Sequence, residues 1–329
     1  MQKIVTLNLN TSNIGGIQTY LKMFYDHIKK KKIYLENFEL NKKISFYKIL
    51  KIFYNCLSAK CIFVTHISIL NLFFLTIFKS KIYFFFYGIE IWKPRSKLAK
   101  YILNNFRFKK YITCSNYSKK YLLKNVKFLR PEIEVIYPYS KFEILKASKE
   151  QKKIKNKKFY NILSISRLEG EVTKGIWLLL KSLKKIKLKN IYIDIVGSGE
   201  QKANMEKYVK KNNIYNVTFH GFVKNLYPLY KNSDLNLYLT DQTGLGCSVV
   251  DSIYFNKPCL ISKKSASVEV FDGIKKYSYK TKNDQDIRGM IKILKELAKS
   301  QKNRTLIYKS QYFKKFSKKN FEKSFDKIL

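Results

Sequence analysis

Two basic residues follow a strand-like run in the second half of the chain. The segment SISRLEGEVTKG, residues 164–175, places Arg167 just past the run and Lys174 at the start of the next helical stretch. Two cations beside the amino terminus of a helix suit the binding of a diphosphate, because the first backbone N–H groups of a helix point outward. Since lysine is common in this chain, two solvated surface cations are the alternative interpretation. Arginine is rare here, which gives Arg167 more weight.

A glycine-punctuated turn precedes a second helical stretch in TDQTGLGCSVVDS, residues 240–252. Backbone amides of Gly244, Leu245 and Gly246 would point along the axis of a helix that starts near residue 247, toward an anion or a sugar hydroxyl. Asp251 lies one to two turns into that helix and could accept hydrogen bonds from ribose hydroxyls. The alternative is an ordinary strand–turn–helix connection with a solvated carboxylate.

Two further glycine pairs stand between strand-like and helical runs. Gly197 and Gly199, in DIVGSGEQ, make a tight turn that either borders a nucleotide base or ribose or is turn chemistry alone. Gly15 and Gly16, in NIGGIQTYLKMFYDHI, fall between the first strand and the first helix. That is the phosphate-side position of a doubly wound domain.

Strand-like runs alternate with helical stretches along most of the chain, which predicts parallel sheets with helical crossovers. The predicted strands are residues 4–9, 61–66, 81–88, 109–115, 132–138, 159–166, 190–197, 216–223, 234–240 and 258–262. Helices are predicted between them and in the lysine- and phenylalanine-rich tail. The predicted fold is therefore α/β, with two doubly wound Rossmann-like domains whose strand carboxyl ends face a cleft.

A polar, lysine-dense stretch at residues 146–158 is predicted to link the domains. We expect an N-terminal, acceptor-side domain over 1–150 and a C-terminal, nucleotide-sugar-binding domain over 151–305. A final helix over 306–329 is expected to pack back toward the N-terminal domain.

The longest apolar run, residues 62–78, is at the short limit for a membrane span and contains four polar residues. We favour the interpretation that this run forms a strand and a buried helix followed by another strand. Shallow attachment to a membrane is the alternative. The start of the chain alternates in hydropathy and shows no apolar core of a signal peptide.

The formal net charge of +43 comes from 66 basic and 23 acidic residues among 329, and 60 of the basic residues are lysines. Lysines spread evenly indicate a solvated surface, with attraction to anionic lipid as an alternative. A nucleic-acid-binding protein would concentrate arginine on one face, so no nucleic-acid partner is expected, and a basic nucleic-acid binder is kept only as a third alternative. Five cysteines without a CxxC pair indicate a reducing compartment, which favours a cytoplasmic protein, at the inner face of the membrane if it attaches there.

Taken in order, these segments resemble the retaining GT-B glycosyltransferases of family 4. The resemblance rests on the Gly15-Gly16 pair, the spacing from Arg167 to Lys174, VGSGE, VTFHG and the turn at 243–251. GIEIW at 88–92 is similar to a stretch of the family's N-terminal domain, and PCLI at 258–261 to its PVI. The resemblance covers most of the chain and is most specific over residues 160–262.

The resemblance implies which residues bind a nucleotide-diphosphate sugar, with a UDP-sugar favoured. Arg167 and Lys174 would hold the diphosphate, and Asp251 would contact the ribose as the second acid of an E-x7-E pattern. Gly15 and Gly16 would border the donor phosphate and the acceptor. The remaining residues expected at the donor are Gly197, Gly199, Glu200, Thr243, Gly244, Leu245 and Gly246.

Two positions depart from the family pattern. Thr243 stands where the family has the glutamate that contacts the donor sugar, and Tyr87 stands where it has a functional histidine. Both hydroxyls can still hydrogen-bond a sugar, and losing one acceptor costs about 1–3 kcal/mol. We therefore count Arg167, Lys174 and Tyr87 as catalytic candidates. A binding or regulatory subunit without catalysis is the alternative.

The resemblance implies a hexosyltransferase acting on a bacterial surface glycan or a lipid-linked saccharide. We expect no metal ion and no cofactor, the nucleotide sugar being a substrate. DQD at 284–286 imitates a metal-binding DxD, but it begins a helical stretch, where acidic residues cap the helix and offset its dipole.

Overall fold

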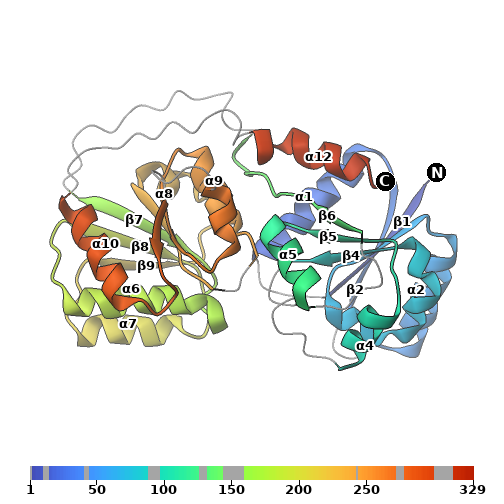
Figure 1. Cartoon of the computed structure of the whole chain (residues 1–329), viewed down its shortest axis with the longest axis horizontal. Helices are drawn as coiled ribbons and strands as arrows, with labels where there is room; N and C mark the ends of the chain where they lie inside the picture. The colour runs from blue at the N-terminus through green and yellow to red at the C-terminus, as the bar shows by residue number, and fades with distance from the viewer. Residues whose placement is uncertain are drawn as a thin grey trace. The chain divides into compact units, whose positions relative to one another are not determined.

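The structure is a computed structural model of the 329-residue chain (Figure 1). It describes residues 2–9, 15–40, 44–87, 97–125, 132–143, 159–241, 244–271, 278–299 and 314–329. The chain divides into two compact units. Unit 1 comprises Met1–Pro138 and Lys319–Leu329, and unit 2 comprises Tyr139–Lys318. The boundaries predicted at 150 and 305, and the whole predicted linker at 146–158, lie outside the described residues and stay predictions.

Unit 1 is built on a six-stranded parallel sheet in the order β2-β1-β3-β4-β5-β6. Its strands are β1 (Lys3–Leu9), β2 (Tyr34–Leu40), β3 (Cys61–Val64), β4 (Ile82–Phe86), β5 (Lys110–Thr113) and β6 (Ile133–Val135). Its α-helices are α1 (Gly16–Lys30), α2 (Phe46–Ser58), α4 (Lys97–Asn105) and α5 (Asn116–Asn125), with 3-10 helices η1 (Ile67–Asn71) and η2 (Phe73–Lys81). β3 and β4 are buried throughout, as expected of central strands covered on both faces.

The apolar run at 62–78 is confirmed as strand, helix and strand, although its helices are 3-10 rather than α and only partly buried, since Phe73 and Ile77 are exposed. It comprises the end of β3, η1 and most of η2, and β4 follows directly. Within the described part of the chain, no helix is long and apolar enough to cross a membrane.

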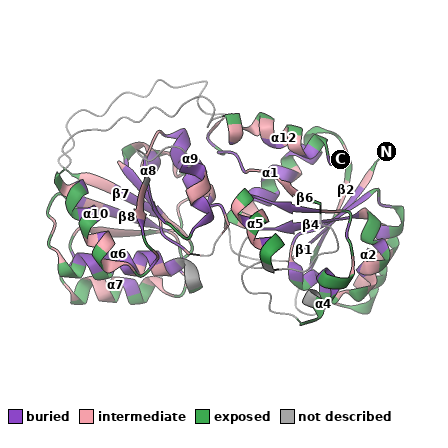
Figure 2. Cartoon of the chain, in the orientation of Figure 1, coloured by how far each residue is buried: buried purple, intermediate pink, exposed green. Residues whose placement is uncertain are grey.

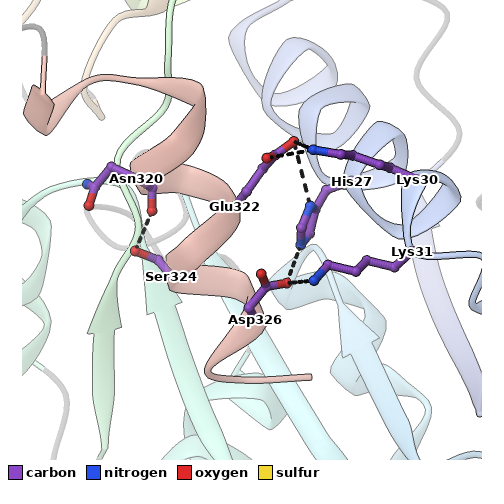
Figure 3. Close-up of polar contacts among 7 residues, drawn as sticks. All are labelled: His27, Lys30, Lys31, Asn320, Glu322, Ser324 and Asp326. Atoms are coloured by element: carbon purple, nitrogen blue, oxygen red, sulfur yellow. Dashed lines mark hydrogen bonds and ion pairs between the residues drawn. The ribbon is translucent and has the colours of Figure 1, made fainter.

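The last helix, α12 (Lys318–Asp326), packs its aromatic side chains into unit 1. The Phe325 ring lies 4.9 Å from the Phe24 ring of α1, and the Phe321 ring lies 5.5 Å from the Tyr20 ring. His27 of α1 is buried beside Asp326, with Nε2 2.9 Å from Oδ1 (Figure 3). The tail predicted to be helical thus ends in a helix fixed by both apolar and charged contacts.

Unit 2 holds a second six-stranded parallel sheet in the order β12-β11-β10-β7-β8-β9. Its strands are β7 (Tyr160–Ile165), β8 (Ile191–Val196), β9 (Val217–Gly221), β10 (Leu235–Tyr238), β11 (Cys259–Ser262) and β12 (Ser278–Thr281). Its helices are α6 (Lys174–Lys185), α7 (Lys202–Lys211), α8 (Tyr227–Asn232), α9 (Cys247–Tyr254) and α10 (Ile287–Lys299), with 3-10 helices η4 (Gly170–Thr173) and η5 (Ala266–Phe271). The predicted α/β class with two doubly wound sheets is confirmed.

The core of unit 2 lies between this sheet and its amphipathic helices (Figure 2). Alternate residues of β8, Ile191, Ile193 and Ile195, are fully buried, and so are Leu179 and Leu180 of α6. The period of two along the strand and the spacing along the helix place these side chains on facing surfaces. Their packing fixes where the ends of β7, β8 and β10 lie.

Candidate functional site

The strand order of unit 2 reverses direction between β7 and β10. The chain proceeds from β7 outward to β8 and β9, then returns to β10 on the other side of β7 and continues to β11 and β12. Ligands of doubly wound sheets bind at the carboxyl ends of strands at such a switch point. A small pocket lies there, lined by Ser164, Ser166, Ile176, Leu237, Tyr238, Leu239 and Thr240.

Helix α6 begins directly beside this pocket. Lys174 is its first residue, and a β-carbon at Gly175 would lie 1.9 Å from the carbonyl oxygen of Leu239. Glycine alone permits so close an approach of a helix to a strand end. The amino terminus of α6, with its outward N–H groups, is thereby held against the end of β10.

Arg167 follows β7 on the same edge of the sheet. Its guanidinium is about half exposed and lies 2.9 Å from the carboxylate of Glu169. An exposed ion pair of this kind contributes little to stability, so Arg167 can exchange Glu169 for a ligand anion. Lys174 and Arg167 thus both stand at the carboxyl edge of the sheet, where the sequence predicts them.

The turn after β8 packs on the loop after β7. Gly197 has φ +142°, and a β-carbon there would lie 1.8 Å from the Ser166 carbonyl oxygen. Gly199 has φ +151°, and a β-carbon there would lie 2.5 Å from the Leu168 carbonyl oxygen, while Leu168 N donates to Ser198 O at 2.9 Å. Both glycines are therefore required by backbone conformation and close approach, apart from any ligand. Glu200, next in the turn, is exposed.

The turn before α9 packs on the end of β10. A β-carbon at Gly246 would lie 2.6 Å from the Tyr238 ring, and Leu245 is buried. Gly244 is described as irregular structure, whereas Thr243 lies outside the described residues. The starts of α6 and α9 consequently both contact residues 238–239 beside the pocket.

Asp251 of α9 is buried, contrary to the alternative of a solvated carboxylate. The Ser140 hydroxyl donates to its Oδ1 at 2.7 Å. Burial raises the pKa of Asp251 to about 6, and the Ser140 hydrogen bond and nearby Lys141 act against that rise. The carboxylate thus holds the first residues of unit 2, and its contact with ribose stays a prediction.

Two predicted positions in unit 1 follow strands of its sheet. Gly15 caps α1, its carbonyl accepting from Thr19 N at 3.0 Å, and no atom of the described residues lies within 4 Å of a β-carbon built on Gly16. Tyr87 follows β4, is 8% exposed and stacks on Phe85 with ring centroids 5.8 Å apart. The GIEIW stretch at 88–92 lies outside the described residues.

A family model described as glycosyl transferases group 1 matches residues 146–311, which is half of the chain. The chain belongs to this family. The match spans the pocket, Arg167, Lys174 and the turn before α9. A search of curated proteins found no match to this glycosyltransferase.

Solved structures similar to this glycosyltransferase share its GT-B fold at low identity. HepE of Anabaena, in complex with UDP and glucose, is 13% identical with a TM-score of 0.76 over 100% of this chain and 99% of that one. A glycosyltransferase from Rickettsia africae is 16% identical with a TM-score of 0.70 over 100% and 98%. The lipopolysaccharide outer core galactosyltransferase WaaB is 15% identical with a TM-score of 0.68 over all of both chains.

The pocket of this glycosyltransferase includes four polar residues that the sequence analysis did not select: Ser164, Ser166, Tyr238 and Thr240. Each lies at or just past the end of β7 or β10. Once the order of the strands is known, polar side chains at the two switch-point strands are the signal that identifies them.

The DQD segment of this glycosyltransferase caps a helix, as predicted. Asp286 Oδ1 accepts from Gly289 N and its Oδ2 from Lys282 N, both at 2.9 Å. These backbone hydrogen bonds hold the pKa of Asp286 below its ordinary value. Among the described residues, no three histidine, cysteine, aspartate or glutamate side chains gather as a metal site.

Proposed function

We propose that the protein is a metal-independent, retaining glycosyltransferase of family 4 that takes a hexose from a UDP-sugar. The acceptor we propose is a bacterial surface glycan or a lipid-linked saccharide. The observation that carries the proposal is the meeting of the α6 start, the Arg167 loop and the turn before α9 at the switch point of unit 2. The UDP-bound state of HepE, a protein of the same fold, supports the choice of nucleotide.

The donor diphosphate would lie at the amino terminus of α6. Lys174 and Arg167 would neutralise its charge, and the first N–H groups of the helix would donate to its oxygens. Arg167 would release Glu169 on binding, since both anions compete for one guanidinium. Glu200, exposed in the turn after Gly199, would lie toward the uridine, and Asp251 toward the ribose.

Transfer with retention would take place on one face of the sugar. The bond between the anomeric carbon and the diphosphate oxygen breaks, and a bond from that carbon to the acceptor oxygen forms on the same face. The acceptor proton passes to the departing phosphate oxygen. The protein contributes positioning and cationic stabilisation of the leaving diphosphate, and the hydroxyls of Thr243 and Tyr87 would hydrogen-bond the sugar.

We place the reaction at the cytoplasmic face of the membrane, where a lipid-linked acceptor would be presented. The basic net charge of the chain supports a location at the membrane surface, because anionic headgroups attract lysines. A nucleotide-binding subunit without catalysis is the second candidate. The threonine in place of the family's sugar-facing acid is the observation that favours it.

The test is binding and turnover with a panel of UDP- and GDP-sugars, with and without EDTA. A UDP-sugar should raise the unfolding temperature and be consumed in both conditions. Lys174→Ala should lower turnover. The control is Lys181, an exposed lysine two turns further along α6, whose replacement by alanine should leave turnover unchanged. Binding without donor hydrolysis or transfer to saccharide acceptors identifies the silent subunit, and no binding of any nucleotide sugar refutes both candidates.

A further inference from the structure

Helix α2 of unit 1 exposes a set of large apolar side chains to solvent. Tyr47 and Phe46 are 76% and 74% exposed, and Tyr54 is 73% exposed. We call the exposed α2 face the five residues Phe46, Tyr47, Leu50, Tyr54 and Leu57. Figure 2 shows exposed residues along this helix at the margin of its unit. Large aromatic residues gathered on one surface are unusual in a soluble domain and mark an interaction site.

The spacing of these residues makes a stripe rather than a scatter. Phe46, Leu50, Tyr54 and Leu57 follow one another at intervals of four, four and three residues, which places them on one side of the helix. Ile52 and Cys56 are buried on another side, against the core of unit 1. The helix is therefore apolar toward the core and apolar again toward solvent.

The neighbouring helix η2 also exposes apolar residues. It packs on α2 through Phe53, whose ring lies 5.8 Å from Phe74 and 5.4 Å from Phe78. On its solvent side it presents Phe73 and Ile77. Two adjoining elements thus both leave large apolar groups uncovered by the described part of the chain.

The charged side chains of α2 and of the residues that follow it to Tyr87 have one sign, and the acidic Glu39 of β2 lies near the start of α2, where Lys48 donates to its carbonyl. Residues 44–87 contain no aspartate or glutamate and five lysines. Lys51 is exposed on α2, and Lys81 donates to the carbonyl of Leu57 at 3.0 Å, beside the exposed α2 face. Lysines bordering an aromatic and aliphatic stripe are typical of helices that lie in the headgroup region of an anionic bilayer.

We propose that the exposed α2 face docks this protein on the surface of an anionic lipid bilayer, with Tyr47 and Tyr54 in the headgroup region. A second copy of the chain fits this face less well, because a two-fold contact would set the same lysines against one another. An anionic surface supplies the complementary charge that this region lacks. The inference rests on the membrane contact proposed above and adds the surface that makes it.

Sedimentation with vesicles tests the proposal. The full chain is mixed with phosphatidylcholine vesicles with and without phosphatidylglycerol, at low and high salt. Tyr47→Ser with Tyr54→Ser should lower partitioning onto anionic vesicles about tenfold or more, since two aromatic side chains no longer leave water. The matched control is Tyr215→Ser with Phe222→Ser, which removes two exposed aromatics of unit 2 and should change nothing.

Each outcome of the sedimentation experiment either supports or overturns the exposed α2 face as the docking surface. Loss of binding in the α2 variant alone, with unchanged unfolding temperature, supports the proposal. Unchanged binding in that variant overturns the α2 docking surface but leaves the membrane contact in place. Absence of vesicle binding by the wild type overturns both the docking surface and the membrane contact. Equal binding to neutral vesicles, or conversion of a dimer to a monomer without loss of vesicle binding, also overturns the docking surface. UDP-sugar binding by the same variants is measured alongside, so a failed docking surface is distinguished from a failed transferase.

Discussion

The Ser140 hydroxyl donates a 2.7 Å hydrogen bond to Asp251 Oδ1, joining a residue at the start of unit 2 to the middle of α9. Tyr230, also fully buried, lies near the same carboxylate. This carboxylate gains hydrogen bonds from Ser140, Tyr230 and the Lys141 backbone, but it loses most of its hydration. Burial therefore dominates, and the pKa of Asp251 rises from 3.8 to about 6.

Asp251 should make folding less favourable as pH rises between about 4 and 6. In that window the folded chain binds more protons than the unfolded chain, so the free energy of unfolding falls with pH, by about 3 kcal/mol in total for this group. Asp251→Asn does not titrate and keeps an oxygen acceptor for Ser140. Urea unfolding from pH 4 to pH 8 should show the variant gaining stability relative to the wild type across the window.

The matched variant for this prediction is Ser140→Ala, which removes the hydrogen bond that favours the charged carboxylate. It should destabilise unit 2 more at pH 7 than at pH 4. A free-energy difference between Asp251→Asn and the wild type that does not change with pH would contradict the assignment.

Replacing Gly175 should damage unit 2, because a β-carbon would meet the Leu239 carbonyl at 1.9 Å. The three nearest atoms are the carbonyl oxygen, carbonyl carbon and β-carbon of Leu239, none of which is the end of a flexible side chain, so α6 must shift away from β10. We expect Gly175→Ala to cost about 1–3 kcal/mol or more and to weaken nucleotide-sugar binding through the displaced helix start. Thermal unfolding and donor titration measure the two effects.

Gly16→Ala is the contrasting substitution in unit 1. Nothing in the part of the chain that the structure describes lies within 4 Å of the added methyl, and alanine favours helix, so stability should be unchanged or rise by up to about 1 kcal/mol. Transfer should nevertheless fall if Gly16 borders the donor phosphate. Full activity of a stable Gly16→Ala protein removes Gly16 from the site.

Arg167→Ala should lower donor affinity about tenfold to a hundredfold, the range for losing hydrogen bonds to a charged group. Its partner Glu169 is exposed enough that stability should change by less than about 1 kcal/mol. Arg107→Ala, another exposed arginine, serves as the control in calorimetric titrations with a UDP-sugar. Equal affinities for the two variants would take Arg167 out of the diphosphate site.

The central strands were predictable from sequence because burial on both faces makes them continuous apolar runs, as in IYFFF of β4. Two edge strands, β2 and β12, were not predicted, whereas the edge strands β6 and β9 were. β2 carries Glu36 and Glu39 and is mostly exposed or half-buried, and β12 consists of SYKT. Such segments become strands through pairing with a neighbour, which no local pattern shows.

The positions of the candidate site residues were predictable for a similar reason, and their environments were not. Arg167 could be placed just past the end of a predicted strand, and Lys174 at the start of a predicted helix. The burial of Asp251 depends on Ser140, which is 111 residues away in sequence. The need for Gly197 comes from the Ser166 carbonyl in the loop after β7. Contacts between segments distant in sequence carry no signal in either segment alone.

The charged contacts that hold α12 on α1 should make its docking sensitive to acid. Asp326 Oδ1 lies 2.9 Å from His27 Nε2 and 3.0 Å from Lys31 Nζ, and Lys30 Nζ lies 3.0 Å from Glu322 (Figure 3). Burial opposes ionisation of Asp326, but the hydrogen bonds from Lys31 and His27 outweigh it and hold its pKa below 3.8. A group with a lowered folded pKa contributes stability above its unfolded value, and that contribution is lost as pH falls below about 4.

Hydrogen exchange of residues 318–326, corrected for intrinsic rates, should therefore show α12 losing protection below about pH 4 before the core strand β4 does. Asp326→Asn should exchange faster than the wild type at pH 7, because the ion pair with Lys31 is gone and the hydrogen bond with His27 is weakened, and it should lose less protection on acidification. Glu322→Gln provides the parallel case on the neighbouring turn. If α12 and β4 lose protection together in every variant, the buried rings of Phe321 and Phe325 hold the helix without help from these charges.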